Sequence, residues 1–239
     1  MRSLLTWGVG VVVTVVCAGL VIAIALVKDT SPWIERVIRF WSRVWIFVSG
    51  TDLEIEGQEN VDPEQSYVVV SNHLSTLDIM ACFLAVRLPI RYLAKKELFR
   101  VPILAQGMRA VGIIEVDRAA RSAVHTQVNK QAAELIAKGR SLIIYAEGTR
   151  PRNGVMKPFK KGAFTMAIAS QLPVLPVSIH GTYEAMPPGT PWVRGGKVQV
   201  VVDPAISTEG LDHSDTGELR DRVYELISKR VTDMGGQVG

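Results

Sequence analysis

The sequence predicts an α/β domain with a mixed or largely parallel sheet flanked by helices, preceded by a hydrophobic membrane helix and an amphipathic interfacial helix. Three observations support this prediction. A long uncharged run lies near the start of the sequence, and after Gly50 short β-rich runs alternate with helical patterns. The 239 residues are enough to bury one ordinary core but not two large domains. We therefore expect membrane-anchoring helices over residues 1–50 and an α/β domain over residues 51–239.

Composition narrows the class of protein. Hydrophobic residues make up 48% of the chain and charged residues 21%, which excludes intrinsic disorder. The net charge of +4 conceals +5 in residues 51–202, and aromatic residues are only 7%. An anionic small substrate or membrane surface therefore fits better than nucleic acid as a partner. Cys17 and Cys82 lack disulfide-framework or zinc spacing, so we expect no metal site and a reducing compartment.

The first element is the uncharged run Leu4–Val27, whose 24 residues would extend about 36 Å as a helix and so match a hydrocarbon core of about 30 Å. A cleaved signal peptide is the alternative, but the run exceeds the usual h-region of about 7–15 residues. Arg2 precedes the run, and four basic residues follow it: Lys28, Arg36, Arg39 and Arg43. This bias places the rest of the chain in the cytoplasm. The pattern leaves open whether the run crosses the bilayer or bends back within one leaflet.

The second element is an amphipathic helix over Pro32–Val48. Its apolar residues recur at helical spacing: Ile34, Val37, Ile38, Trp41, Val44, Trp45 and Val48. Charged residues lie on the other side, as expected for a helix at a membrane surface. Because it directly follows the hydrophobic run, we expect this helix to lie on the membrane. The alternative is a helix packed against the α/β domain.

The remaining elements form the α/β alternation. Strands are predicted at Tyr67–Val70, Ile90–Ala94, Leu142–Tyr145, Val174–Ile179 and Val198–Val202. Helices are predicted at Leu77–Val86, Ser122–Lys138, Lys161–Ser170 and Thr216–Val231.

The clearest chemical signal follows the first of these strands. His73 and Asp78 are five residues apart, so they cannot pair in the middle of one helix, but they can pair if His73 precedes the helix. The carboxylate would then orient the imidazole as a general base. The alternative is that Ser75 and Asp78 form a capping box at the helix start. No GxSxG motif is present, which favours direct base catalysis over a covalent intermediate.

A second polar segment follows the strand Leu142–Tyr145. It reads Glu147-Gly148-Thr149-Arg150, and the stretch from Glu147 to Lys161 has a net charge of +4. The glycine allows close approach of a ligand to the backbone, and the guanidinium of Arg150 suits a phosphate group. The alternative is a solvated basic loop.

These segments resemble a known family. Asn72-His73-x4-Asp78 is similar to the NHX4D motif of the glycerolipid acyltransferases. Three further blocks of that family follow in order: Gly112–Arg118, Glu147–Arg150 and Leu172–Val177. The resemblance extends from about Leu53 to Val202 and is greatest to the bacterial 1-acylglycerol-3-phosphate acyltransferases.

The resemblance implies a function and a set of residue roles. His73 would remove the proton from the sn-2 hydroxyl of lysophosphatidate, and Asp78 would orient His73. The acceptor site would include Lys95, Lys96, Arg118, Glu147, Gly148, Thr149 and Arg150, with Arg118 and Arg150 on the phosphate. Pro173 and Pro176 would line the acyl chain.

The same resemblance implies the other reactants and the location. The donor would be acyl-CoA or acyl carrier protein, no cofactor or metal would be needed, and the domain would face the cytoplasm at the inner membrane. Another acceptor, such as lyso-ornithine lipid or glycerol 3-phosphate, remains an alternative within the family. Outside it, the alternatives are a membrane-attached thioester hydrolase and a non-catalytic binder of anionic lipid.

Overall fold

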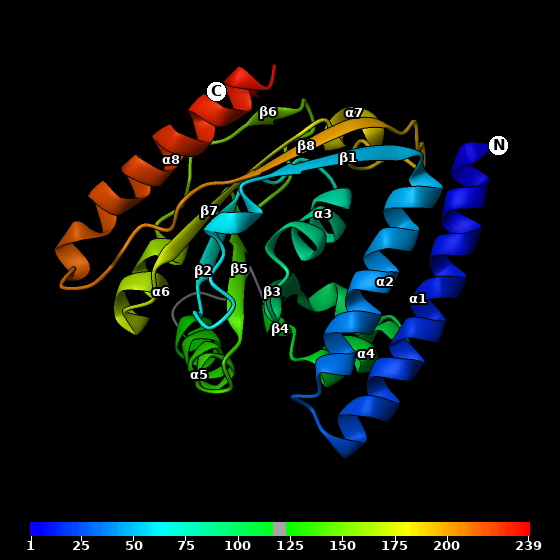
Figure 1. Ribbon diagram of the computed structural model, residues 1–239, viewed down its shortest axis with the longest axis horizontal. Helices are drawn as coiled ribbons and strands as arrows, with labels where there is room; N and C mark the ends of the chain where they lie inside the picture. Colours follow the sequence, from blue (N-terminus) through cyan, green and yellow to red (C-terminus); the bar gives the residue numbers. More distant parts are fainter. Residues whose placement is uncertain (117–122) are drawn as a thin grey trace.

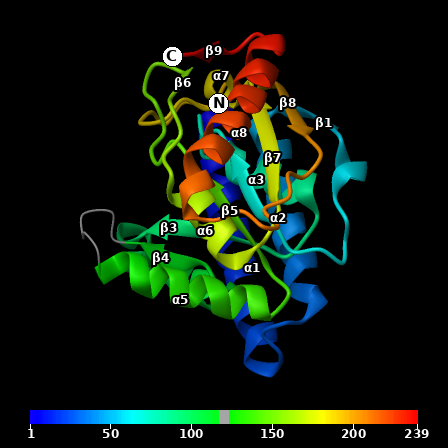
Figure 2. The same cartoon turned by 90° about the vertical axis from the view of Figure 1, so that its left-hand side faces the viewer.

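The computed structural model of the protein describes residues 1–116 and 123–239, and it shows a sheet with helices packed on both faces (Figure 1, Figure 2). The main sheet has seven strands in the order β1-β8-β7-β2-β5-β3-β4. Their bounds are β1 (Thr51–Glu56), β2 (Val68–Ser71), β3 (Ile90–Lys95), β4 (Ile114–Val116), β5 (Ser141–Tyr145), β7 (Val174–His180) and β8 (Gly196–Val202). Only the pairing of β7 with β8 is antiparallel among these strand pairs. The predicted fold class is confirmed.

A second, two-stranded sheet pairs β6 (Val155–Met156) with β9 (Gln237–Val238). The helices are α1 (Arg2–Val27), α2 (Pro32–Ser49), α3 (Leu77–Val86), α4 (Leu104–Val111), α5 (Ala123–Ala137), α6 (Gly162–Ser170), α7 (Thr182–Ala185) and α8 (Thr216–Asp233), with 3₁₀ turns η1 (Gln58–Asn60), η2 (Lys96–Arg100) and η3 (His213–Asp215). The sequence pattern predicted four of the α/β-domain helices to within two residues at each end. It did not predict the strands β1, β4, β6 and β9 or the helices α4 and α7.

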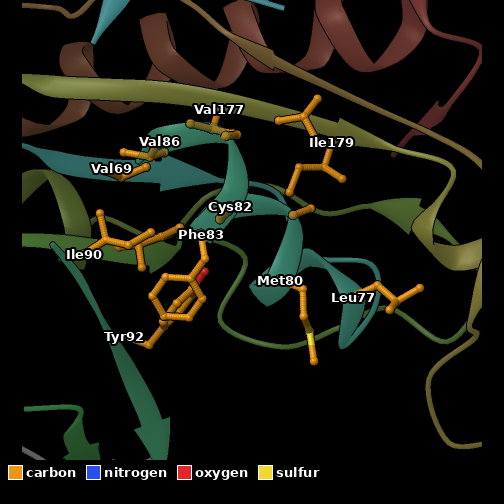
Figure 3. Close-up of a cluster of buried hydrophobic side chains, with 14 of the residues drawn as sticks. Val69, Leu77, Met80, Cys82, Phe83, Val86, Ile90, Tyr92, Val177 and Ile179 are labelled. Carbon is orange, nitrogen blue, oxygen red and sulfur yellow. The ribbon is translucent and has the colours of Figure 1, made fainter. Parts of the chain in front are cut away.

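The central strands are buried on both faces, which explains why β2 is buried at every residue and begins with three valines instead of alternating. Successive side chains of a strand point to opposite faces of the sheet. Val69 accordingly packs in a cluster with α2 and α3, whereas Val68 and Val70 pack in a cluster with α6 and α8. Figure 3 shows part of the first cluster, where α3 lies against β2 and β7. This burial fixes the position of the strand that precedes His73.

Helix α1 contacts the α/β domain at both of its ends. Near the amino end, Trp7 Nε1 donates a hydrogen bond to the carbonyl of Pro191 at 2.8 Å. Just beyond the carboxyl end, the carboxylate of Asp29 accepts a hydrogen bond from Lys138 Nζ at 2.5 Å. Among the described helices, α1 is the one long and apolar enough to cross a membrane. It nevertheless lies along the domain beside α2 (Figure 1).

Close packing brings α1 against its neighbours between these ends. A Cβ atom on Gly10 would lie 2.4 Å from the ring of Trp45 on α2. A Cβ atom on Gly107 of α4 would lie 2.9 Å from the Cβ of Ala18. Small residues at these two contacts therefore allow the three helices to approach one another.

The structure corrects the prediction for the apolar face of α2. Ile34, Ile38 and Trp45 are buried, and they belong to the cluster that also contains α3. This face therefore packs against the α/β domain, which was the alternative stated above. The outward face carries a different pattern, which we call the aromatic–arginine stripe: Trp33, Arg36, Phe40, Arg43 and Phe47 are all exposed.

Candidate active site

The predicted site residues converge on one edge of the sheet. Strands β2, β5 and β3 are adjacent and parallel, so their carboxyl ends lie at the same edge. His73 follows β2, Glu147 follows β5, and Lys95 is the last residue of β3. In open α/β sheets, this edge is where ligands bind.

His73 and Asp78 are hydrogen-bonded. Helix α3 begins at Leu77, so His73 lies in the loop before it, and its Nδ1 is 2.8 Å from Asp78 Oδ2. The His73 side chain is 13% exposed and the Asp78 side chain is fully buried. Because Nδ1 contacts the carboxylate, Nε2 is the ring nitrogen available to a substrate.

Asp78 also stabilises the turn that carries His73. Its Oδ2 accepts hydrogen bonds from the backbone N–H groups of Leu74 and Ser75, each at 2.7 Å. The dyad contact is therefore present, whereas only one half of the capping box is formed: Asp78 accepts from the N–H of Ser75, but Ser75 Oγ donates to the carbonyl of Met186 and the N-cap of α3 is Thr76. Asp78 Oδ1 is buried and has no hydrogen-bond partner in the described part of the chain.

Tyr145 forms the surface beneath the imidazole, a feature that sequence reasoning missed. Its ring stacks on that of His73, with centroids 3.8 Å apart and planes 6° apart. Its hydroxyl lies 4.0 Å from Cys82 Sγ. Burial raises the pKa of Tyr145 well above its ordinary value and raises the pKa of Cys82 to about 12. Both groups are therefore neutral, and Cys82 is a poor nucleophile. Only the position of Tyr145 at the end of a predicted strand, two residues before Glu147, could have indicated this role.

Glu147 joins two segments of the site. It is 2% exposed. Its Oε1 accepts a hydrogen bond from the backbone N–H of His73 at 2.7 Å, and its Oε2 accepts one from the N–H of Lys157 at 2.9 Å. Burial raises the pKa of Glu147 to about 7. This side chain therefore positions backbone and does not lie open to solvent.

Arg150 extends toward the start of α3. Its Nη1 donates a hydrogen bond to Thr76 Oγ1 at 2.5 Å, three residues from His73. Arg150 and Thr149 are exposed. Gly148 has a φ of +77°, and a Cβ atom there would lie 3.0 Å from Lys160 Nζ. The backbone turn after Glu147 thus requires glycine, and it places Arg150 beside the dyad.

The other predicted residues do not all lie near the dyad. Lys95 is exposed and Lys96 is partly buried at the end of β3, two strands and so about 10 Å from β2. Arg118 lies outside the described residues. Pro173 precedes β7, and its carbonyl accepts a hydrogen bond from Val68 N–H at the amino end of β2, so it lies at the edge of the sheet opposite to His73. Its contact with the acyl chain stays a prediction. Pro176 is paired with Val70 inside the sheet.

A cavity of about 250 Å³ lies beside this site. Its lining includes Leu74, which follows His73, and also His180 from the end of β7. The remaining lining comes from α7, from the loop after β5 and from the last residues of the chain: Asn153, Gly154, Tyr183, Glu184, Gly235, Gly236 and Gln237.

Comparisons with known proteins find similar sequences. A family model described as Acyltransferase matches residues 52–180. The 1-acyl-sn-glycerol-3-phosphate acyltransferase of Pseudomonas aeruginosa is 31% identical over 205 residues, covering 83% of this chain and 77% of that protein. The human 1-acyl-sn-glycerol-3-phosphate acyltransferase alpha is 30% identical over 206 residues, covering 86% of this chain and 73% of that protein.

A solved structure is also similar. The crystal structure of the 1-acyl-sn-glycerophosphate acyltransferase from Thermotoga maritima matches with a TM-score of 0.85 and 26% sequence identity. The match covers 98% of this chain and 94% of that chain, so it includes α1 and α2.

Proposed function

The chain belongs to the acyltransferase family, and from this premise we propose that it acylates the sn-2 hydroxyl of lysophosphatidate to give phosphatidate, a step of phospholipid biosynthesis. The observation that carries the proposal is the 2.8 Å contact between His73 Nδ1 and Asp78 Oδ2 at the ligand-binding edge of the sheet. The names of the three similar proteins described above support the choice of acceptor.

The dyad acts as a general base on the acceptor. Nε2 of His73 takes the proton of the hydroxyl while the hydroxyl oxygen attacks the carbonyl carbon of the acyl thioester. The carbon–sulfur bond then breaks, and the imidazolium returns the proton to the leaving thiolate. Asp78 holds the proton on Nδ1 and stabilises the imidazolium charge.

Basic side chains bind the phosphate of the acceptor. Arg150 is the best placed of them, since its guanidinium contacts Thr76 close to His73. A guanidinium can form two parallel hydrogen bonds to phosphate oxygens. Lys95, Lys96 and Arg118 are further candidates, and Thr149 and Gly148 bring the backbone of the loop to the same ligand.

The acyl donor in this proposal is acyl-CoA or acyl carrier protein. Acyl transfer from a thioester requires a base and hydrogen-bond donors, so the reaction needs neither a metal nor a cofactor. Cys82 takes no part as a nucleophile, because burial raises its pKa to about 12.

We further propose that the protein lies on the cytoplasmic face of the inner membrane. Helix α1 contacts the domain at both ends, through Trp7 and through Asp29, so spanning the bilayer would break one of these contacts. Association with a single leaflet keeps both. The aromatic–arginine stripe of α2 suits the headgroup region, where aromatic and basic side chains are favoured.

The test is thiol release by the purified protein in mixed micelles. We expect release from acyl-CoA or acyl carrier protein to depend on lysophosphatidate, and we expect His73→Ala to abolish it. His213→Ala is the matched control, because His213 is exposed on η3 and should leave turnover unchanged. Full turnover by His73→Ala would overturn the mechanism.

The choice of acceptor is tested separately. The values of kcat/KM for lysophosphatidate, glycerol 3-phosphate and lyso-ornithine lipid should rank lysophosphatidate first. Arg150→Ala should lower kcat/KM for the phosphate-bearing acceptors more than kcat/KM for lyso-ornithine lipid, so that the difference between these values becomes smaller. Thioester cleavage without any acceptor would instead indicate a hydrolase, and lipid binding without thiol release would indicate a binder.

A further inference from the structure

The loop after β5 is held at its two ends. Residues 147–157, which we call the Glu147 loop, begin at Glu147 and end just beyond β6 at Lys157. Between these ends lies Arg150. The N–H of Lys157 donates a hydrogen bond to Glu147 Oε2 at 2.9 Å, and the other oxygen of Glu147 accepts the N–H of His73 at 2.7 Å. A shift of β6 would therefore move Lys157 and Glu147, and with them the backbone of His73.

Strand β6 is only two residues long, and the last residues of the chain extend its pairing. Val155 pairs with Gln237 and Met156 with Val238, in parallel (Figure 2). The N–H of Gly239 donates a hydrogen bond to the carbonyl of Met156 at 3.0 Å. Residues 235–239, which we call the C-terminal segment, thus continue the sheet edge that ends the Glu147 loop.

The C-terminal segment is itself fixed to α8. The hydroxyl of Tyr224 donates a hydrogen bond to the carbonyl of Gly239 at 3.0 Å, and the N–H of Gly236 donates one to the carbonyl of Val231 at 2.8 Å. A Cβ atom on Gly236 would lie 2.5 Å from Val231 Cγ1 and 3.0 Å from His180 Nδ1. The tight return of the chain from α8 toward β6 therefore requires glycine at this position.

The contacts form a continuous path from α8 to His73. It runs through the C-terminal segment, β6, Lys157 and Glu147. Lys157 directly follows β6 in the chain, and the other steps are backbone hydrogen bonds or hydrogen bonds from a backbone N–H to a carboxylate. Such a path can hold the backbone of His73 in place, although none of its groups takes part in the reaction.

We infer that the C-terminal segment is a positioning element for the acceptor site: by pairing with β6, it holds the Glu147 loop so that Arg150 and the backbone of His73 keep their places. The link to the acceptor rests on the proposed function. The link to the position of the loop does not.

The first experiment deletes residues 235–239. We expect the KM for lysophosphatidate to rise about tenfold or more, because small displacements of binding groups are costly, whereas the KM for the acyl donor should change little. Amide hydrogen exchange of residues 148–157 should become faster. The amides of β2, β5 and β7 should keep their protection, since their pairing does not involve the segment.

A matched pair of glycine substitutions makes the same test with a single added methyl group. Gly236→Ala introduces the close contacts with Val231 and His180, whereas Gly217→Ala, in the first turn of α8, meets no atom within 4 Å. We expect faster exchange of the Glu147 loop and a raised acceptor KM for Gly236→Ala alone. If the deletion does not fold, this pair decides the question.

Two results would overturn the inference. Exchange of residues 148–157 at the wild-type rate in both variants would show that buried Met156 and the contact of Tyr183 with the carbonyl of Arg152 hold the loop without help. Faster exchange with an unchanged acceptor KM would remove the link to the site. Failure of the proposed function is separate, because it would appear as absent wild-type turnover while the exchange measurement still applies.

Discussion

At the scale of the residue, Asp78 shows how one side chain meets two structural needs. Its Oδ2 receives three hydrogen-bond contacts, two from the backbone of the turn and one from His73. The carboxylate therefore fixes both the ring and the loop that carries the ring. Spacing alone left these two roles as alternatives because the position of the helix start decides between them, and that start depends on local hydrogen bonds.

The stacked ring of Tyr145 gives the first prediction. Tyr145→Phe keeps an aromatic face 3.8 Å from the imidazole and should retain most of the wild-type kcat. Tyr145→Leu removes the face, and since aromatic stacking contributes about 1 kcal/mol, kcat should fall about three- to tenfold. Steady-state kinetics of both variants provide the measurement. Equal kcat values for the two variants would contradict a role of stacking in placing His73.

Glu147 gives a prediction for the pH dependence of stability. Its pKa is raised from 4.5 to about 7, so the folded protein keeps this proton where the unfolded chain has lost it. The free energy of unfolding should therefore fall as the pH rises from about 4.5 to about 7, by about 3 kcal/mol from this group. Glu147→Gln should remove that contribution.

Urea unfolding at pH 5 and pH 7.5 measures this effect. The loss of one carboxylate acceptor in Glu147→Gln lowers stability by a similar amount at both pH values, so only the difference between the two pH values reports on the titration. An unchanged difference in the variant would show that the proton is not held by Glu147.

Helices and strands were predictable to different degrees. Helix α3 has the bounds that the apolar pattern predicts, Leu77–Val86, because it is buried on most sides. Strand β1 was missed, although its exposure alternates along Thr51–Glu56, because its partner β8 lies about 145 residues later and no local signal marks an edge strand. Tyr145 was missed for a related reason: its contact with His73 depends on the adjacency of β2 and β5.

The packing of α1 against α2 gives a prediction at the scale of the element. Gly10→Leu places a side chain where a Cβ atom alone would lie 2.4 Å from the ring of Trp45, so the two helices must separate. We expect a loss of about 1–3 kcal/mol in stability and faster amide exchange in α1. Gly19→Leu is the matched control on the same helix, where a Cβ atom meets nothing within 4 Å. Equal effects of the two substitutions would contradict the close packing.

At the scale of the whole molecule, the two docked ends of α1 support the proposed association with a single leaflet. Labelling of single cysteines with an impermeant maleimide tests this in oriented membrane vesicles. A cysteine inserted after Met1, Lys28→Cys at the other end of α1, and Glu225→Cys on α8 as the domain reference are all at exposed positions. We expect all three to react from the same face. Reaction of either end of α1 from the face opposite to Glu225→Cys would show that α1 crosses the bilayer.

The strand order also has a consequence for how the protein is made. The strand before His73, β2, pairs with β5 and β7, so its neighbours include residues up to Val177. Such non-local pairing forms slowly and exposes apolar strands meanwhile. During synthesis, α1 and α2 leave the ribosome more than 100 residues before β2 can be completed on both sides. Helices α1 and α2 are therefore available before the dyad is assembled, and if the protein acts at a membrane as proposed, they would meet it first.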